Sequence, residues 1–296
     1  MARTVQQPAG TSANAEAIEA WDGPLFDAFV RFRGTLVAGL QSHGDLALAE
    51  HPPPVGGRVL DIGCGFGDMS QQLATLIGPE GSVLGVDAAP RFIEAAREEA
   101  REAGVANVEF RVEDLEAAAF EERFDAAYSR MGTMFFANPV AALRRVGEAL
   151  VPGGRLVMVV WRSKEENEWV SHPLRITESF VLKPEEYEEP TCGPGPFSMA
   201  NADTTSGILL SAGFEAISLR RCDLPVLMGA DVEDAVEMVM TIGPSGEILR
   251  LAGERAAHLH APIAEALREA FAEYGGPDGV RALASTWIVS ATAPAA

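Results

Sequence analysis

The stretch Arg58-Val59-Leu60-Asp61-Ile62-Gly63-Cys64-Gly65-Phe66-Gly67-Asp68 decides the fold class of this chain of 296 residues. Its apolar beginning predicts a short buried strand that ends at Gly63. The three glycines predict a tight turn, and the apolar residues that follow Asp68 recur at the spacing of one helical face. Strand, glycine-rich turn and helix in this order are typical of the nucleotide-binding half of a doubly wound α/β sheet.

The spacing and charge of the turn indicate which ligand it takes. The turn reads Gly-x-Gly-x-Gly, so its third glycine comes one residue earlier than in the dinucleotide motif Gly-x-Gly-x-x-Gly. A pyrophosphate favours a helix N-terminus without nearby negative charge, whereas Asp61 and Asp68 flank this turn. Two carboxylates favour a cation, and S-adenosylmethionine (SAM) carries a sulfonium and an ammonium but no phosphate. Taken alone, the turn is equally compatible with a plain strand-helix connection.

Two further strand ends carry acidic residues. Val83-Leu84-Gly85-Val86 predicts a second apolar strand, and Asp87 follows it twenty residues after Gly67, where a ribose-binding carboxylate is expected. Val108 to Val112 alternates like a strand and leads to Asp114, whose carboxylate is a suitable acceptor for the exocyclic amine of adenine. Each acid also has an ordinary structural interpretation, as a helix cap for Asp87 and as a solvated loop charge for Asp114.

The ordered set of motifs from about residue 58 to residue 161 resembles a class I SAM-dependent methyltransferase. The resemblance is carried by VLDIGCGFGD, VLGVDAAP, VEDLE, FDAAYSRMGTMFFANPVAALRRVGEALVPGGRLVMVVW and the distances between them. The SRMGTMFF motif and the later GPGPFSMANADTTSGILLSAGF resemble a bacterial subgroup that acts on small molecules, often in secondary metabolism. The resemblance implies a Rossmann-like, seven-stranded, mostly parallel sheet with an antiparallel seventh strand, helices on both faces and a mainly helical cap.

The resemblance also implies roles for individual positions. The residues implied to contact SAM or its product S-adenosylhomocysteine (SAH) are Asp61, Gly63, Cys64, Gly65, Gly67 and Asp68 on the methionine half, Asp87 and Ala88 at the ribose and adenine, Asp114 and Leu115 at the adenine, and Ser129 and Arg130 beside the transferable methyl. Cys64 is interpreted as a backbone-contacting residue and not as a nucleophile. Substrate or lid positions are assigned to Trp21, Phe29, Met134 and Trp169.

Composition limits the partners. Forty-three acidic residues against 23 basic ones give a formal charge of −20, which disfavours a nucleic-acid partner and favours a small-molecule substrate. Three widely spaced cysteines predict neither a disulfide framework nor a cysteine-rich metal site, and no metal is expected. We expect a cytoplasmic protein without a membrane span or signal peptide.

The motifs divide the chain into three parts. Residues 1–50 predict a helical lid or arm, residues 51–162 the SAM-binding core, and residues 163–296 the substrate-pocket insertions together with the last strands of the same sheet. The whole is expected to form one compact domain. The helical N-terminus is as compatible with packing on a second subunit as on its own core.

The expected reaction is an in-line methyl transfer that depends mainly on orientation and exclusion of water. A general base is required only for an acceptor that must lose a proton. Of the five histidines (His43, His51, His172, His258 and His260), His172 follows the predicted fifth strand and is the candidate base, although a structural role is more common for such a residue. Glu168 and Tyr187 are weaker candidates. The alternatives are an NAD(P)-dependent oxidoreductase on the same fold and a non-catalytic SAM-binding protein.

Overall fold

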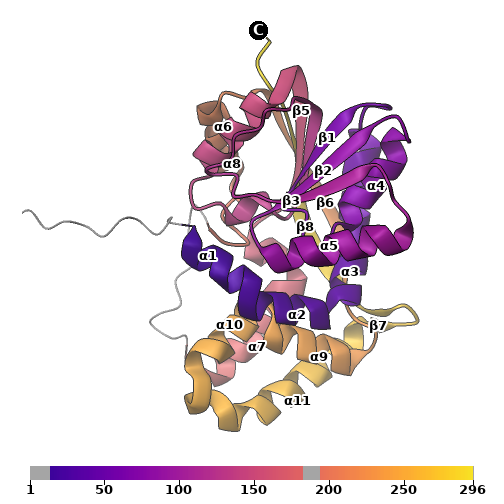
Figure 1. Cartoon of the computed structure of the whole chain (residues 1–296). Helices are drawn as coiled ribbons and strands as arrows, with labels where there is room; N and C mark the ends of the chain where they lie inside the picture. The colour runs from indigo at the N-terminus through magenta and orange to yellow at the C-terminus, as the bar shows by residue number, and fades with distance from the viewer. Residues whose placement is uncertain (1–13, 183–193, 296) are drawn as a thin grey trace, which may run out of the picture.

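A single eight-stranded sheet forms the centre of the computed structural model, which describes residues 14–182 and 194–295 (Figure 1). The strands are β1 (Arg58–Ile62), β2 (Ser82–Asp87), β3 (Val108–Val112), β4 (Phe124–Arg130), β5 (Leu150–Trp161), β6 (Glu215–Gly229), β7 (Gly275–Gly276) and β8 (Gly279–Thr292). Their order is β3-β2-β1-β4-β5-β8-β6, and the short β7 pairs only with β8. Strands β1 to β5 pair in parallel, and β8 is antiparallel to both β5 and β6. The predicted fold class is therefore confirmed, with β7 as an additional short strand.

Helices cover both faces of the sheet. One face carries α3 (Arg33–Glu50) and α4 (Asp68–Ile77), with α5 (Pro90–Ala103) beside β2 and β3. The other face carries α6 (Pro139–Ala149) and α8 (Ala202–Ala212). Because both faces are covered, the inner strands are apolar on both sides, as in β1, where every residue after Arg58 is buried.

Two helical groups lie at the carboxyl ends of the parallel strands (Figure 1). The first contains α1 (Ala15–Ala20), a π-helical turn (Trp21–Leu25) and α2 (Phe26–Arg31), and its chain direction changes at Gly23, which is non-helical before Pro24. The second, which we call the cap, consists of α7 (Glu168–Phe180), α9 (Val232–Thr241), α10 (Gly243–Ala252) and α11 (His260–Phe271), together with the short 3-10 turns Gly253–Leu259 and Ala272–Tyr274. The cap has its own apolar core around Met238, Ile248 and Leu267.

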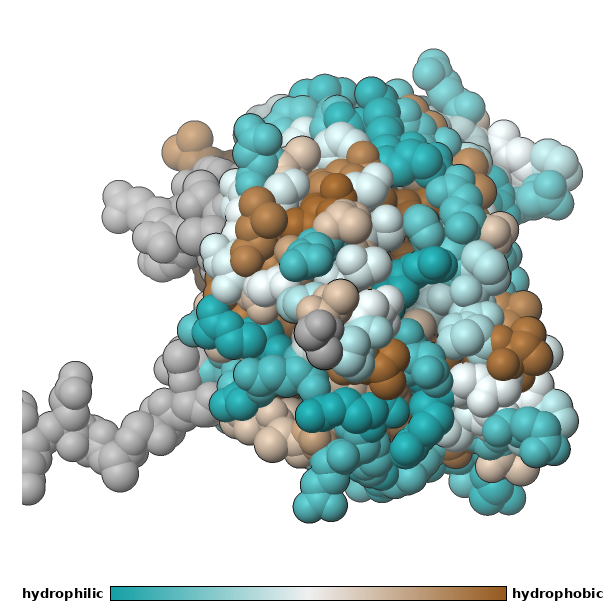
Figure 2. Space-filling view, turned by 90° about the horizontal axis from the view of Figure 1, so that it is seen from above, coloured by the Kyte–Doolittle hydropathy of each residue, from teal (hydrophilic) through white to brown (hydrophobic). Residues whose placement is uncertain are grey.

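The surface at the opposite end of the sheet is mostly hydrophilic, with hydrophobic residues in separate patches (Figure 2). Among the described residues, the exposed large hydrophobic side chains include Val55, Leu76 and Leu210. No helix in the described ranges combines the length and apolar character needed to cross a bilayer. Tyr187 and Cys192 lie outside the described residues, so the structure says nothing about either of them.

Candidate active site

The glycine turn lies at the carboxyl end of β1 and connects it to α4. All three glycines have positive φ angles, of 64° at Gly63, 53° at Gly65 and 77° at Gly67. A Cβ on Gly63 would lie 2.8 Å from the backbone of Gly132, and a Cβ on Gly67 would lie 2.7 Å from the Phe110 ring. A Cβ on Gly65 would find no protein atom closer than 3.9 Å. Gly63 and Gly67 are therefore needed for packing, whereas Gly65 leaves its side of the backbone open to a close approach.

Asp87 is the last residue of β2 and faces the middle of this turn. Its Oδ2 accepts a hydrogen bond from the Gly65 amide at 3.1 Å, and its Oδ1 accepts one from the Ala89 amide at 3.0 Å. Burial raises the pKa of Asp87, and these backbone donors oppose that rise. Ala88, which follows Asp87 in the sequence, is half-buried. The carboxylate is thus fixed against Gly65, at the predicted ribose position.

A second pair of carboxylates lies at the β1 end of the turn. Asp61 is 1% exposed and accepts a hydrogen bond from Ser70 Oγ at 2.5 Å. Burial raises the pKa of Asp61 to about 7, and the charges of Asp68 and Asp87 act in the same direction. Asp68 forms an ion pair with Arg130, whose side chain is 9% exposed. Both protonation states of Asp61 are therefore populated near neutral pH.

Ser129 and Cys64 have structural contacts in this region. Ser129 Oγ donates a hydrogen bond to the Ile62 carbonyl at 2.9 Å, which connects the end of β4 to the end of β1. The Cys64 amide donates to the Val86 carbonyl at 3.0 Å. Burial, reinforced by the carboxylates of Asp87 and Asp61, raises the pKa of the Cys64 thiol well above its ordinary value. A protonated, buried thiol is a poor nucleophile, which agrees with a backbone-contacting role.

The loop after β3 is joined to the N-terminal segment. Asp114 Oδ1 accepts hydrogen bonds from the Glu116 amide and from Asn14 Nδ2, both at 3.0 Å. Leu115 beside it is buried. Asn14 could not be predicted as a site residue, because only the tertiary structure brings it to a residue one hundred positions away.

Aromatic side chains of the N-terminal segment pack on the beginning of α5. The Trp21 ring lies 5.2 Å from that of Phe29, 6.2 Å from Phe92 and 4.8 Å from Phe135. Phe66, inside the glycine turn, joins this cluster through Phe92 at 4.9 Å. The predicted lid residues Trp21 and Phe29 are thus connected to the turn through Phe92. Phe66 and Phe92 were not predicted as site residues.

Apolar side chains lie where β4 and β5 end. Met134 is buried and its Sδ accepts a hydrogen bond from the Trp161 amide at 3.3 Å. The Trp161 ring lies 5.1 Å from that of Trp169, at the beginning of the cap. Ser198 Oγ donates to the Met134 carbonyl at 2.6 Å, so the segment before α8 also packs here. The predicted substrate residues Met134 and Trp169 are therefore neighbours of the same tryptophan.

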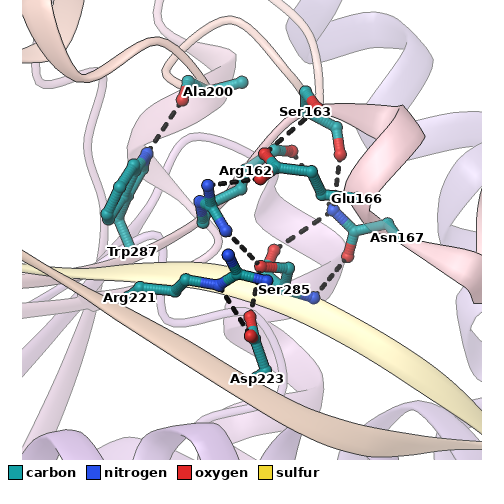
Figure 3. A network of polar contacts seen from close by, with 9 residues as sticks. All are labelled: Arg162, Ser163, Glu166, Asn167, Ala200, Arg221, Asp223, Ser285 and Trp287. Atoms are coloured by element: carbon teal, nitrogen blue, oxygen red, sulfur yellow. Dashed lines mark hydrogen bonds and ion pairs between the residues drawn. The ribbon is translucent and has the colours of Figure 1, made fainter.

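A polar network holds the beginning of the cap on the sheet (Figure 3). Arg162 forms an ion pair with Glu166 and donates to Ser285 Oγ at 3.0 Å. Asn167 donates to the Ser285 carbonyl at 3.1 Å and accepts from the Ser285 amide at 2.8 Å. Ser285 Oγ in turn donates to Asp223 at 2.5 Å. The network fixes the first turn of α7 against β8 and β6.

His172 is placed differently from the other candidates. Its Nδ1 lies 2.9 Å from Tyr274 Oη, within the cap. Among the described residues, no hydrogen bond or ring contact connects it to the glycine turn. Its role as a base stays a prediction. Glu168 is exposed.

The fold and the turn define the class of protein, a Rossmann-like nucleoside-binding domain with acidic residues at its strand ends. A model of the methyltransferase domain family matches residues 54–203, half of the chain, so the chain belongs to that family. This confirms the predicted resemblance to class I SAM-dependent methyltransferases and goes against the oxidoreductase alternative.

Curated relatives match the central part of the chain. Aklanonic acid methyltransferase DauC from Streptomyces sp. (strain C5) is 42% identical over 105 residues, which are 35% of this chain and 48% of the relative. A ubiquinone biosynthesis O-methyltransferase from Cereibacter sphaeroides is 41% identical over 114 residues, which are 38% of this chain and 44% of the relative. The chain therefore matches less than half the length of either relative.

Solved structures show the same fold. Phosphoethanolamine N-methyltransferase 2 from Haemonchus contortus, solved with SAM, has a TM-score of 0.58 at 18% identity. The match covers 97% of this chain and 61% of that protein's chain. The YcgJ protein of Bacillus subtilis has a TM-score of 0.55 at 18% identity, and the match covers 86% of this chain and 100% of that protein's chain.

Proposed function

We propose that this protein transfers a methyl group from SAM to a hydroxylated, mostly apolar or aromatic small molecule in the cytoplasm. The observation that carries the proposal is the arrangement of Gly65 and Asp87. The glycine offers an open backbone surface, and the carboxylate is fixed 3.1 Å from the Gly65 amide. The names of the curated relatives, which act in aklanonic acid and ubiquinone metabolism, support an aromatic acceptor.

The residues present fit SAM. The open side of Gly65 admits the ligand against the backbone, and Asp87 offers two acceptor oxygens to ribose hydroxyls. Asp61 offers a carboxylate to the α-ammonium, and Asp114 offers an acceptor to the adenine amine. SAM, when bound, supplies an activated methyl group on a sulfonium.

The remaining residues orient the acceptor and exclude water. The half-buried Trp169 packs on Trp161, and the buried Trp161 and Met134 support it from the ends of β4 and β5, so these residues form the apolar wall for the acceptor. Trp21 and Phe29, which pack beside the glycine turn, reduce access of water from the N-terminal side. Orientation of the acceptor in a dry site is the main requirement of a displacement at an already activated carbon.

Calorimetric titration with SAH and, separately, with NADH tests the proposal. We expect SAH to bind with a dissociation constant on the order of micromolar, about −8 kcal/mol, and NADH to give no heat of binding. Binding of NADH alone would overturn the proposal. If SAH binds, release of SAH from SAM in the presence of a panel of phenols and hydroxyquinones then separates an enzyme from a protein that only binds SAM.

The raised pKa of Asp61 predicts that the protein releases protons when SAH binds. A carboxyl with a pKa of about 7 is half-protonated at neutral pH, and an ammonium placed beside it lowers that pKa. We therefore expect SAH to release up to about half a proton per molecule bound at neutral pH. Calorimetry in buffers of different ionisation enthalpy measures this release, and Asp61→Asn should abolish it.

The same carboxyl affects stability, and the direction follows from its raised pKa. The protonated form stabilises the free protein fully below the ordinary pKa of 3.8, and this contribution is lost as pH rises through about 7. Asp61→Asn should therefore flatten the decline of Tm across this range. An unchanged proton release in the variant would show that Asp61 is not the titrating group.

A further inference from the structure

His43 is a buried histidine without a hydrogen-bond partner. It lies in the middle of α3 with 0% exposure, and neither ring nitrogen has a partner among the described residues. The backbone of Ala284 lies close enough to raise the pKa of the ring, but it does not meet hydrogen-bond geometry with either nitrogen. Leaving such a group unsatisfied costs about 1–3 kcal/mol, so its presence requires an explanation.

The position of His43 relates it to the carboxyl ends of β4 and β5. Its ring makes an edge contact with Trp161, the last residue of β5, at a centroid distance of 6.1 Å. The next residue, Gly44, packs on Arg130, the last residue of β4; a Cβ there would lie 3.3 Å from the Arg130 side chain. His43 is therefore a neighbour of the same tryptophan that contacts Met134 and Trp169.

The helix holds the ring in this position. A Cβ on Gly39, one turn earlier in α3, would lie 2.9 Å from the Leu227 carbonyl of β6. Glycines at 39 and 44 thus allow α3 to approach the sheet closely at both sides of His43. These close approaches keep α3 in place and hold the imidazole beside Trp161.

The charges around His43 keep the ring neutral. Burial lowers its pKa to about 4, Arg130 acts in the same direction, and Asp223 opposes it. A neutral imidazole has one nitrogen that accepts and one that donates a hydrogen bond. The nearby Arg130 disfavours a cationic amine, so an uncharged hydroxyl is the better matched donor.

We propose that His43 is a specificity-determining residue of the acceptor site, where its ring accepts a hydrogen bond from a hydroxyl group of the methyl acceptor. The inference rests on the proposed function and names the chemistry of its acceptor. A site built to bind a hydroxyl rejects the analogue that lacks it, because the buried nitrogen is then left unpaired. This role differs from that of the candidate base His172, which stays a separate prediction.

The test compares two probes on the SAH-loaded protein, 4-ethylphenol and 4-ethylanisole, in which a methyl group replaces the hydroxyl proton and removes the hydrogen-bond donor. Histidine ring nitrogens are followed by 15N NMR, and the His43 signals are assigned with His43→Gln. We expect 4-ethylphenol to shift the His43 signals and to bind about fivefold more tightly than the anisole, as one hydrogen bond of about 1 kcal/mol predicts. In His43→Leu the two probes should bind equally.

A matched control is His258→Leu, at an exposed histidine of the cap, which should retain the fivefold preference. His43→Leu should fold with an unchanged or higher Tm, because an apolar residue replaces an unpaired polar one. If His43→Leu does not fold, the proposal is still tested by the wild-type protein: 4-ethylphenol should shift the His43 15N signals, which are assigned with His43→Gln.

The outcomes separate the two proposals. Equal binding of both probes by the SAH-loaded wild type, or no binding of either, overturns the role of His43 and leaves the methyltransferase assignment in place. A signal shift at His172 in place of His43 overturns it as well. Failure of SAH to bind overturns the proposed function itself and this inference with it.

Discussion

Asp87→Ala should reduce the affinity for SAH about a hundredfold, because a carboxylate that binds two ribose hydroxyls contributes on the order of 3 kcal/mol. Its oxygens already accept hydrogen bonds from the amides of Gly65 and Ala89 at 3.1 and 3.0 Å, so the side chain is held in place before the ligand arrives. Such preorganisation limits the entropy lost on binding. Calorimetric titration of the purified variant with SAH measures the effect.

Two variants control for a loss of structure. Asp87→Asn keeps one acceptor oxygen and should lose only about tenfold in affinity, roughly one hydrogen bond. Asp125→Ala removes an exposed strand aspartate that accepts a hydrogen bond from the Arg58 amide at 2.8 Å at the opposite end of the sheet. It should leave SAH binding unchanged. Wild-type affinity in Asp87→Ala, with a normal melting profile, would disprove the ribose assignment.

The sheet could be predicted from sequence because its signals are local. The inner strands β1 and β2 are short apolar runs that end at a glycine and an acid, and parallel strands buried on both faces have such apolar runs. The antiparallel direction of the last long strand, β8, came from the family resemblance and is confirmed. The small β7 hairpin carries no apolar pattern and could not be predicted.

The proposed cofactor residues could be placed together from the sequence for the same reason, since motif and spacing put them at neighbouring strand ends. The acceptor side has no such local signal. His172 was chosen for its nearness in sequence to β5, and the structure places it beside Tyr274 in the cap. His43 precedes the first strand and lies in a helix whose apolar pattern is weak, because glycines and alanines contribute much of its buried face. Only the close approach of α3 to the sheet brings His43 to Trp161.

Substitutions in the glycine turn should separate ligand binding from folding. Gly65→Ala should lower the affinity for SAH by at least about tenfold, since a methyl group would occupy the space that the ligand needs against the backbone. The protein itself offers no obstacle, because the nearest atom to the new Cβ is 3.9 Å away. The remaining cost is the positive φ of 53°, about 1 kcal/mol of stability. Thermal unfolding and SAH titration of the same preparation measure both effects.

Gly63→Ala should affect mainly the stability of the protein, whereas Gly65→Ala should affect mainly its affinity for SAH. Its φ of 64° is similar, but its Cβ would lie 2.8 Å from the Gly132 Cα, a backbone atom that cannot move aside easily. Strain and overlap together should destabilise the protein by on the order of 3 kcal/mol. Gly104→Ala, at an exposed helix end with a φ of 69° and no atom within 4 Å, measures the backbone cost alone. If Gly65→Ala bound SAH as tightly as Gly104→Ala does, the ligand would not lie against this turn, and the positive φ of Gly65 would serve the chain reversal only.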